Sequence, residues 1–194
     1  MSELVEGFEF VSGLSSDVSV LGTKSIERDT HYYNSAHKLG QMLAEHNLTT
    51  ITGGAPGIGE AANKGAKEKG GRSLGIGMKV HGETRLNEYV DESIIFNFPF
   101  TRKMVMTAPS DAFVFYPGGF GTMHELFEIL TLIQTGKMER VPVILVDHDF
   151  WEPWHKFIKK NLDHELHTIS SQDDELYQIV DDESTVMDLI DNMT

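Results

Sequence analysis

The chain of 194 residues carries 16 Lys and Arg against 30 Asp and Glu, a net charge of −14 at pH 7, and its hydrophobic content of 40% is typical of one globular domain. Because nucleic acids and anionic membranes are bound mainly through clustered cations, this acidity argues against both as partners. The chain has no cysteine, no basic leader and no apolar run of about 18 residues, so we expect a cytoplasmic protein without disulfides, thiolate metal sites or membrane spans.

The negative charge is concentrated near the C-terminus. Residues 163–194 contain ten acids and no Lys or Arg, which leaves −4 for residues 1–162. A separate acidic interaction tail is one interpretation. We favour a solvated face and C-terminal helix of the same domain, residues 1–194, because apolar residues continue at helix and strand spacing. These apolar residues are Ile179, Val180, Val186, Leu189 and Ile190.

Short apolar runs alternate with amphipathic stretches, which is the pattern of βαβ units around a parallel sheet. In chain order the pattern predicts strand 18–22, helix 30–45, strand 48–52, helix 58–69, strands 73–77 and 93–96, helix 102–108, strand 112–116, helix 122–134, strand 141–146 and helices 151–161 and 184–192. Right-handed crossovers then give a doubly wound, mostly parallel α/β sheet flanked by helices. Ligands bind beyond the carboxyl ends of such strands, so the loops after the strands are the places to look for function.

A glycine-rich loop, TGGAPGIGEAANKGA, follows the second predicted strand. A tight turn needs one or two glycines, whereas four occur here, at Gly53, Gly54, Gly57 and Gly59. Bare backbone amides at the start of a helix favour an anionic ligand. The loop lacks the Lys-Ser/Thr pair of a Walker NTPase, and no acid ends the next strand to hold the ribose of a dinucleotide. We therefore expect ligand contact of another kind.

A second glycine-rich segment, PGGFGTMHELFE, follows the fifth predicted strand. Its glycines form a potential anion cradle at Gly118, Gly119 and Gly121. Thr122 can cap the next helix or donate its hydroxyl to a phosphate. One interpretation of Glu125 is a capping box, in which its carboxylate reaches back to the Thr122 amide. The other is chemistry, because Glu125 and Glu128 share a helix face and a carboxylate beside an anion site is electrostatically costly.

Two adjacent cations, Arg102 and Lys103, begin the helix before that strand. An arginine holds a phosphate or carboxylate with two parallel hydrogen bonds, so the pair suggests an anionic partner. The alternative is a surface pair that complements nearby acids.

The segments TGGAPGIGEAANKGA, FTRKMVM and PGGFGTMHELFEILT resemble, in order and spacing, the LOG-like family of cytokinin riboside 5′-monophosphate phosphoribohydrolases, often labelled a lysine decarboxylase family. The resemblance runs from about residue 18 to residue 180, and PGGxGTxxE is its most specific motif. It implies a Rossmann-like homodimer that uses no cofactor. Such an enzyme hydrolyses the N-glycosidic bond of a nucleoside 5′-monophosphate, of the AMP or cytokinin riboside type, to the free base and ribose 5-phosphate.

The resemblance also implies roles for individual residues. The catalytic Arg of the family falls on Arg102 and the catalytic Glu on Glu125, while a substrate-binding Lys falls on Lys103. A binding Thr falls on Thr131, and a binding Glu in the loop before the Arg-Lys pair falls on Glu83. The phosphate loop comprises Gly118, Gly119, Phe120, Gly121 and Thr122, and we add Gly53, Gly54 and Gly57 as binding residues. Two positions depart from the common pattern: Ala55, where many relatives have Gly, and His124, where many have an acid.

The implied mechanism suits these residue types. Cleavage of the C1′–N bond develops oxocarbenium character, which the Glu125 carboxylate can stabilise while it activates water. Arg102 either orients that carboxylate or contacts substrate. The histidines lack metal-ligand spacing, so we expect no metal. A pyridoxal decarboxylase would need a Schiff-base lysine, for which Lys103 is a poor candidate. The competing hypothesis is a non-catalytic nucleotide or cofactor carrier or sensor of the same fold.

Overall fold

The computed structural model describes residues 2–79 and 86–192. One seven-stranded sheet has the order β4-β3-β2-β1-β5-β6-β7, and every neighbouring pair is parallel. The strands are β1 (Asp17–Leu21), β2 (Thr49–Thr52), β3 (Ser73–Met78), β4 (Glu92–Phe96), β5 (Ala112–Phe115), β6 (Val143–Val146) and β7 (Gln178–Val180). The order reverses at β1, which lies between β2 and β5, so the predicted doubly wound α/β fold is confirmed.

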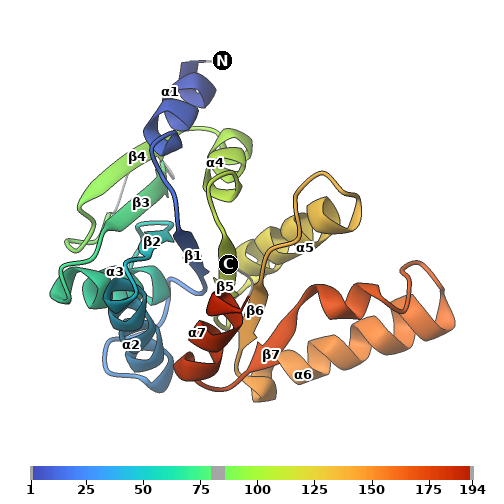
Figure 1. The fold of residues 1–194 in the computed structure, drawn as a ribbon. Coiled ribbons are helices and arrows are strands. Elements are labelled where there is room, and N and C mark those ends of the chain that lie inside the picture. Colours follow the sequence, from blue (N-terminus) through green and yellow to red (C-terminus); the bar gives the residue numbers. More distant parts are fainter. Residues whose placement is uncertain (1, 80–85, 193–194) are drawn as a thin grey trace.

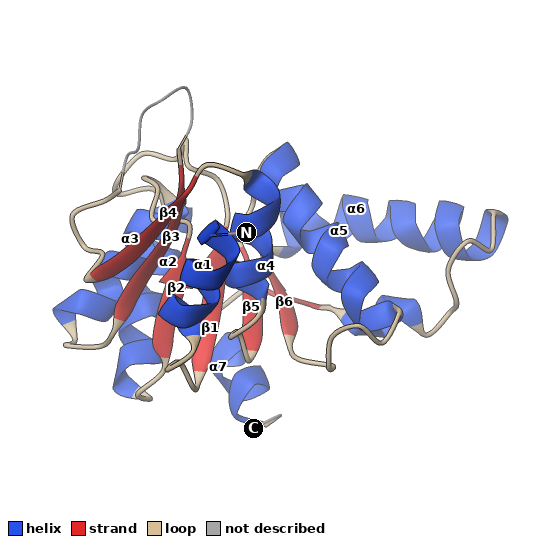
Figure 2. Cartoon of the chain, turned by 90° about the horizontal axis from the view of Figure 1, so that it is seen from above, coloured by secondary structure: helices blue, strands red, loops and turns tan. Residues whose placement is uncertain are grey.

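Helices cover both faces of the sheet (Figure 1). The α-helices are α1 (Ser2–Val11), α2 (His31–Glu45), α3 (Ile58–Glu68), α4 (Pro99–Thr107), α5 (Phe120–Gln134), α6 (His148–Phe157) and α7 (Glu183–Asp191). A π-helix (Ile158–Glu165) continues α6, and a 3₁₀ turn (Asp173–Leu176) precedes β7. Helices α2, α3 and α7 form one buried cluster with the sheet, and α1, α4, α5 and α6 form the other. In Figure 2, α5 and α6 extend away from the sheet.

The six predicted strands are confirmed with ends within two residues of the prediction. Strands β1, β2, β5 and β6 are buried throughout, as central parallel strands are. Strands β5 and β6 are continuous apolar runs, whereas β1 and β2 mix apolar residues with buried Asp, Ser or Thr. Two elements were not predicted. Strand β7 has only three residues, and α1 carries three acids that obscure its apolar stripe.

The unpredicted helix α1 fixes the start of α4, the helix that carries Arg102. Glu3 accepts a 2.9 Å hydrogen bond from the Asn97 amide and a 3.2 Å bond from the Thr101 hydroxyl. The Asn97 backbone and side-chain amides lower the pKa of Glu3, since they stabilise its charged form. A carboxylate at this end also complements the dipole of α4. The sequence placed the start of this helix at Arg102, but it begins earlier, at Pro99, a residue suited to the first helical position.

The acidic C-terminal section forms part of the sheet and core. Strand β7 pairs with β6, and α7 buries Val186, Met187 and Ile190. Its acids serve local structure: hydrogen bonds from the Ser184 hydroxyl and the Thr185 amide lower the pKa of Asp182, the α7 N-cap, to about 2. No described helix is long and apolar enough to cross a membrane.

Candidate active site

A cavity of about 790 Å³ opens at the carboxyl ends of β1, β2 and β3, beside the reversal of strand order. Its size lies within the roughly 300–1,000 Å³ typical of small-molecule sites. Four parts of the chain supply its walls: residues 20–25 in and after β1, four residues of the loop and helix start after β2, Gly77 and Met78 at the end of β3 with Leu86, and four residues at the start of α5. The four residues after β2 are Gly53, Ala55, Pro56 and Gly59, and those of α5 and its N-cap are Gly119, Gly121, Thr122 and Glu125. Arg102 completes the lining from α4. The cavity therefore lies where doubly wound folds bind ligands.

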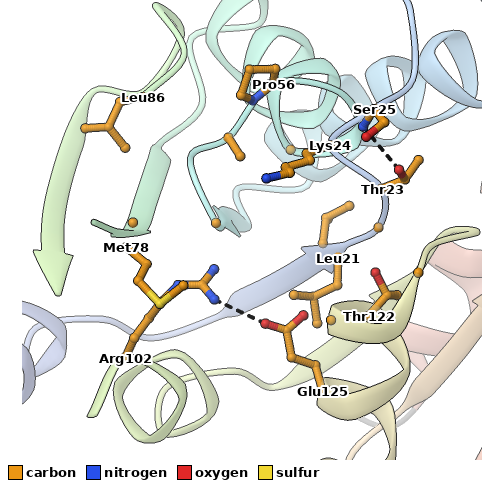
Figure 3. Close-up of a pocket in the computed structure, with 18 residues that line it drawn as sticks. Leu21, Thr23, Lys24, Ser25, Pro56, Met78, Leu86, Arg102, Thr122 and Glu125 are labelled. Atoms are coloured by element: carbon orange, nitrogen blue, oxygen red, sulfur yellow. Dashed lines mark hydrogen bonds and ion pairs between the residues drawn. The ribbon is translucent and has the colours of Figure 1, made fainter. Parts of the chain in front are cut away.

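Arg102 and Glu125 meet inside this cavity (Figure 3). Arg102 Nη1 lies 3.2 Å from Glu125 Oε1, and the two side chains are only 14% and 17% exposed. Arg102 Nε donates a 2.7 Å hydrogen bond to the Ile76 carbonyl, which fixes the guanidinium at the end of β3. Arg102 thus contacts the Glu125 carboxylate directly, which is the geometry that the first of its two possible roles requires.

A missing side chain at Gly53 makes room for this arrangement. A Cβ atom at Gly53 would lie 2.6 Å from Arg102 Nη2, too close for a real carbon. A side chain at this position would therefore displace the guanidinium, the flexible end of Arg102, which lies over the β2–α3 loop.

The start of α5 provides free backbone donors. The helix begins at Phe120, with Gly119 as its N-cap, and no side chain caps it. The first internal bond runs from the Met123 amide to the Gly119 carbonyl at 3.0 Å, so the three preceding amides have no partner within the helix. The capping-box interpretation is wrong, because Thr122 is the third helical residue and Glu125 pairs with Arg102. Free amides and the helix dipole together favour an anion.

The glycines of this segment differ in their surroundings. Gly119 and Gly121 line the cavity, and a Cβ at either would meet nothing within 4 Å, so ligand-sized space lies against their backbone. Glycine at position 118 is explained by packing, because a Cβ there would collide with the Thr122 side chain. Thr122 is buried and lines the cavity, whereas the Phe120 side chain is 97% exposed and can contribute only its backbone to the cradle.

The first glycine loop is held by a buried polar network. Thr52 donates to Asn63 at 2.6 Å and accepts from the Gly54 amide at 2.9 Å, and Asn87 donates to the Gly54 carbonyl at 3.1 Å. Gly54 and Gly57 have φ angles of +68° and +79°, a conformation that favours glycine, and neither lines the cavity. Of the predicted binding glycines in this loop, the structure brings Gly53 to the cavity.

Lys103 faces a different direction from Arg102. Successive helical residues point about 100° apart, and Arg102 lines the cavity whereas Lys103 does not. Lys103 Nζ lies 3.0 Å from Glu128 Oε2 and 2.8 Å from His124 Nδ1, and its side chain is 12% exposed. This ion pair runs beside the Arg102–Glu125 pair and joins α4 to α5.

Another predicted binding residue, Thr131, does not line the cavity. Thr131 is exposed on α5, and its hydroxyl donates a 2.7 Å hydrogen bond to the Phe127 carbonyl. Glu83 lies outside the described residues.

The sequence analysis missed a contribution from the loop after β1. Thr23, Lys24 and Ser25 all line the cavity. The Thr23 amide donates to the Pro117 carbonyl and its carbonyl accepts from the Ile58 amide, each at 3.1 Å, so this loop is tied to both glycine loops. This loop also follows the carboxyl end of a strand, where ligands bind in such folds. It contains only one glycine, so its sequence lacks the glycine-rich signal of the other two loops. Within residues 2–79 and 86–192, no group of three or more metal-ligating side chains is arranged to hold a metal ion.

The fold places this chain in the Rossmann-like α/β class, and comparisons with known proteins identify the family. The family model described as possible lysine decarboxylase matches residues 60–190. The chain is 32% identical over 137 residues to a cytokinin riboside 5′-monophosphate phosphoribohydrolase from Arabidopsis thaliana, a match covering 69% of this chain and 64% of that protein, just under two thirds of its length. It is 30% identical over 142 residues to an enzyme of the same name from Rhodococcoides fascians, covering 68% of each chain.

The chain therefore belongs to this LOG-like family, as its motifs predicted. A solved structure of a molybdenum cofactor binding protein from Rippkaea orientalis has a similar fold, with a TM-score of 0.67 and 22% identity over 92% of this chain and 97% of that one.

Proposed function

We propose that this chain hydrolyses the N-glycosidic bond of a nucleoside 5′-monophosphate, releasing the free base and ribose 5-phosphate. The observation that carries the proposal is the Arg102–Glu125 pair, which lies in one cavity with the free amides of α5. The names of the relatives from Arabidopsis thaliana and Rhodococcoides fascians support the same reaction.

The geometry suggests a division of labour. The amides at the start of α5 and the Thr122 hydroxyl would hold the 5′-phosphate, which fixes the ribose over Glu125. Glu125 Oε1 is held by Arg102, while Oε2 has no hydrogen bond among the described residues, so it can face the sugar. That carboxylate would stabilise the oxocarbenium-like transition state and take a proton from the attacking water.

Lysine decarboxylation, which the family description names, receives less support. That chemistry requires a lysine amine free to form a Schiff base with pyridoxal phosphate. Lys103 Nζ is instead held by Glu128 and His124 and does not line the cavity. We assign the lysine that does face the cavity, Lys24, a different role below.

A substrate panel tests the proposal. Purified protein is incubated with AMP, GMP, CMP and isopentenyladenosine monophosphate, and release of ribose 5-phosphate is measured. Release from at least one of them is expected. Nucleotide binding without release from any would favour the carrier or sensor hypothesis and contradict the proposed reaction.

We also propose that the chain forms a homodimer, through aromatic side chains that lie exposed beside the cavity. Phe98 and Phe100 at the start of α4 are 65% and 69% exposed, and Phe120 begins α5. Large exposed aromatic side chains are enriched at protein interfaces. Light scattering should give twice the mass of 21.7 kDa, and Phe98→Ser with Phe100→Ser should halve it. A wild-type monomer at micromolar concentration would contradict the proposal.

A further inference from the structure

Lys24 extends into the cavity from the loop after β1, opposite Arg102 and Glu125 (Figure 3). Within residues 2–79 and 86–192, no carboxylate lies within ion-pair distance of its Nζ. Its backbone is fixed, because the preceding Thr23 is hydrogen-bonded to Pro117 and Ile58 of the two glycine loops. The Ser25 amide also donates to the Thr23 hydroxyl at 3.1 Å. Among the described residues, this positive charge on the cavity wall thus has no carboxylate partner.

The proposed ligand position indicates what Lys24 can reach. With the phosphate at the start of α5 and C1′ over Glu125, the base must occupy the remaining part of the cavity. The walls there are apolar, from Pro56, Met78 and Leu86. In Figure 3 the Lys24 side chain lies on the side of Pro56 and its Nζ points away from Thr122. Its ammonium is therefore placed to meet the outer edge of a base held against these apolar side chains.

The chemistry of an ammonium group restricts the base. Lysine offers three donors and no acceptor. A 6-oxopurine such as guanine or hypoxanthine presents two acceptors, O6 and N7, on one edge, whereas adenine presents one acceptor and an amino donor there. Among the described lining residues, Glu125 is the only carboxylate, and it is held by Arg102. The described part of the cavity wall therefore offers this edge a cation without a matching carboxylate.

We infer that Lys24 binds the O6/N7 edge of the base, selects 6-oxopurine nucleoside 5′-monophosphates over adenine nucleotides, and stabilises the departing base. This inference rests on the proposed function and names its substrate class.

The bonds balance without a further reactant. Water oxygen bonds to C1′, and its proton passes to Glu125 and then to solvent. The C1′–N electron pair stays on the base, whose negative charge is stabilised through O6 and N7 by the Lys24 N–H donors until the base takes a proton from solvent.

The test compares Lys24→Met with Lys137→Met, a matched change of charge at an exposed lysine after the end of α5. For the wild type, we expect kcat/KM for IMP and GMP to exceed that for AMP by about tenfold or more. Lys24→Met should lower kcat/KM for IMP and GMP by about 10- to 100-fold and for AMP by less than about threefold. Lys24→Arg should keep the preference, because arginine also donates to O6 and N7. Lys137→Met should match the wild type.

Ribose 5-phosphate, which has the phosphate but no base, separates the two parts of the ligand. Its affinity, measured by calorimetry, should be the same for wild type and Lys24→Met. Equal losses for all three nucleotides, or weaker ribose 5-phosphate binding, would overturn the inference and place Lys24 on the phosphate.

If no nucleotide is hydrolysed, the proposed reaction fails, and binding alone decides the role of Lys24. Tighter wild-type binding of IMP than of AMP, lost in Lys24→Met, supports base recognition. Equal binding of both by both proteins, or no binding at all, overturns it.

Discussion

Replacing Gly121 with alanine should stabilise the protein and weaken its ligand binding at the same time. Gly121 is the second residue of α5, and a Cβ there would meet no atom within 4 Å. Alanine in a helix is favoured over glycine by about 0.5–1 kcal/mol, which raises Tm by about 1–4 °C in a chain of this size. The packing of the folded protein therefore does not require glycine at this position.

Phosphate binding, in contrast, would require glycine at position 121, because the new methyl group would project where the ligand must approach the backbone. Loss of one hydrogen bond to a charged group costs about 1.5–3 kcal/mol, or about 10- to 150-fold in Kd. Thermal unfolding by circular dichroism and titration calorimetry with ribose 5-phosphate measure the two effects. Gly13→Ala is the matched control, since its Cβ also meets nothing within 4 Å and it lies away from the cavity. Unchanged ribose 5-phosphate affinity in Gly121→Ala would refute the phosphate position.

Two further predictions concern Arg102 and Asp17, the first residue of the central strand β1. Gly53→Ala should displace the Arg102 guanidinium and lower kcat by about 10- to 100-fold in steady-state assays. The unfolding free energy from urea titration should change by less than about 1 kcal/mol, because only the end of a flexible side chain must move. A Gly53→Ala variant that is strongly destabilised or unfolded would contradict this prediction. Burial raises the pKa of Asp17, whose carboxylate oxygens lack hydrogen-bond partners, and nearby Asp111 adds repulsion. The protonated form is therefore favoured in the folded state, so the stability tied to Asp17 is full below its unfolded pKa and is lost as pH rises through the folded one. Asp17→Asn should exceed the wild type in stability by on the order of 1 kcal/mol at pH 7, with the gain shrinking toward pH 4; a gain that grows on acidification would contradict the assignment.

The fold could be predicted from the sequence where burial leaves a strong pattern. Central strands such as Val143–Val146 are wholly apolar because helices cover both faces. Strand β7 is only Gln178–Val180 at the sheet edge, and a three-residue pattern is too short to distinguish from a loop. Helix α1 depends on tertiary contacts, such as the close approach of Gly7 to Val105, which local sequence does not reveal.

The site could be predicted only as far as local motifs reach. Gly119, Gly121 and the pairing partners Arg102 and Glu125 belong to motifs whose chemistry is readable from residue types. The direction of a side chain is not readable in this way, so Lys103 was grouped with Arg102 although it turns to Glu128. Lys24 was missed because its importance arises from the packing of three loops around one cavity.

The most direct test of the account is the rate of ribose 5-phosphate release from IMP, GMP and AMP by the wild type and by Glu125→Gln. Glutamine keeps the size of the side chain but removes the charge and the base. We predict release by the wild type and a loss of about 10²- to 10⁴-fold in kcat for Glu125→Gln, with ribose 5-phosphate still bound. Near-normal turnover in Glu125→Gln, or no release by the wild type, would contradict the proposed function.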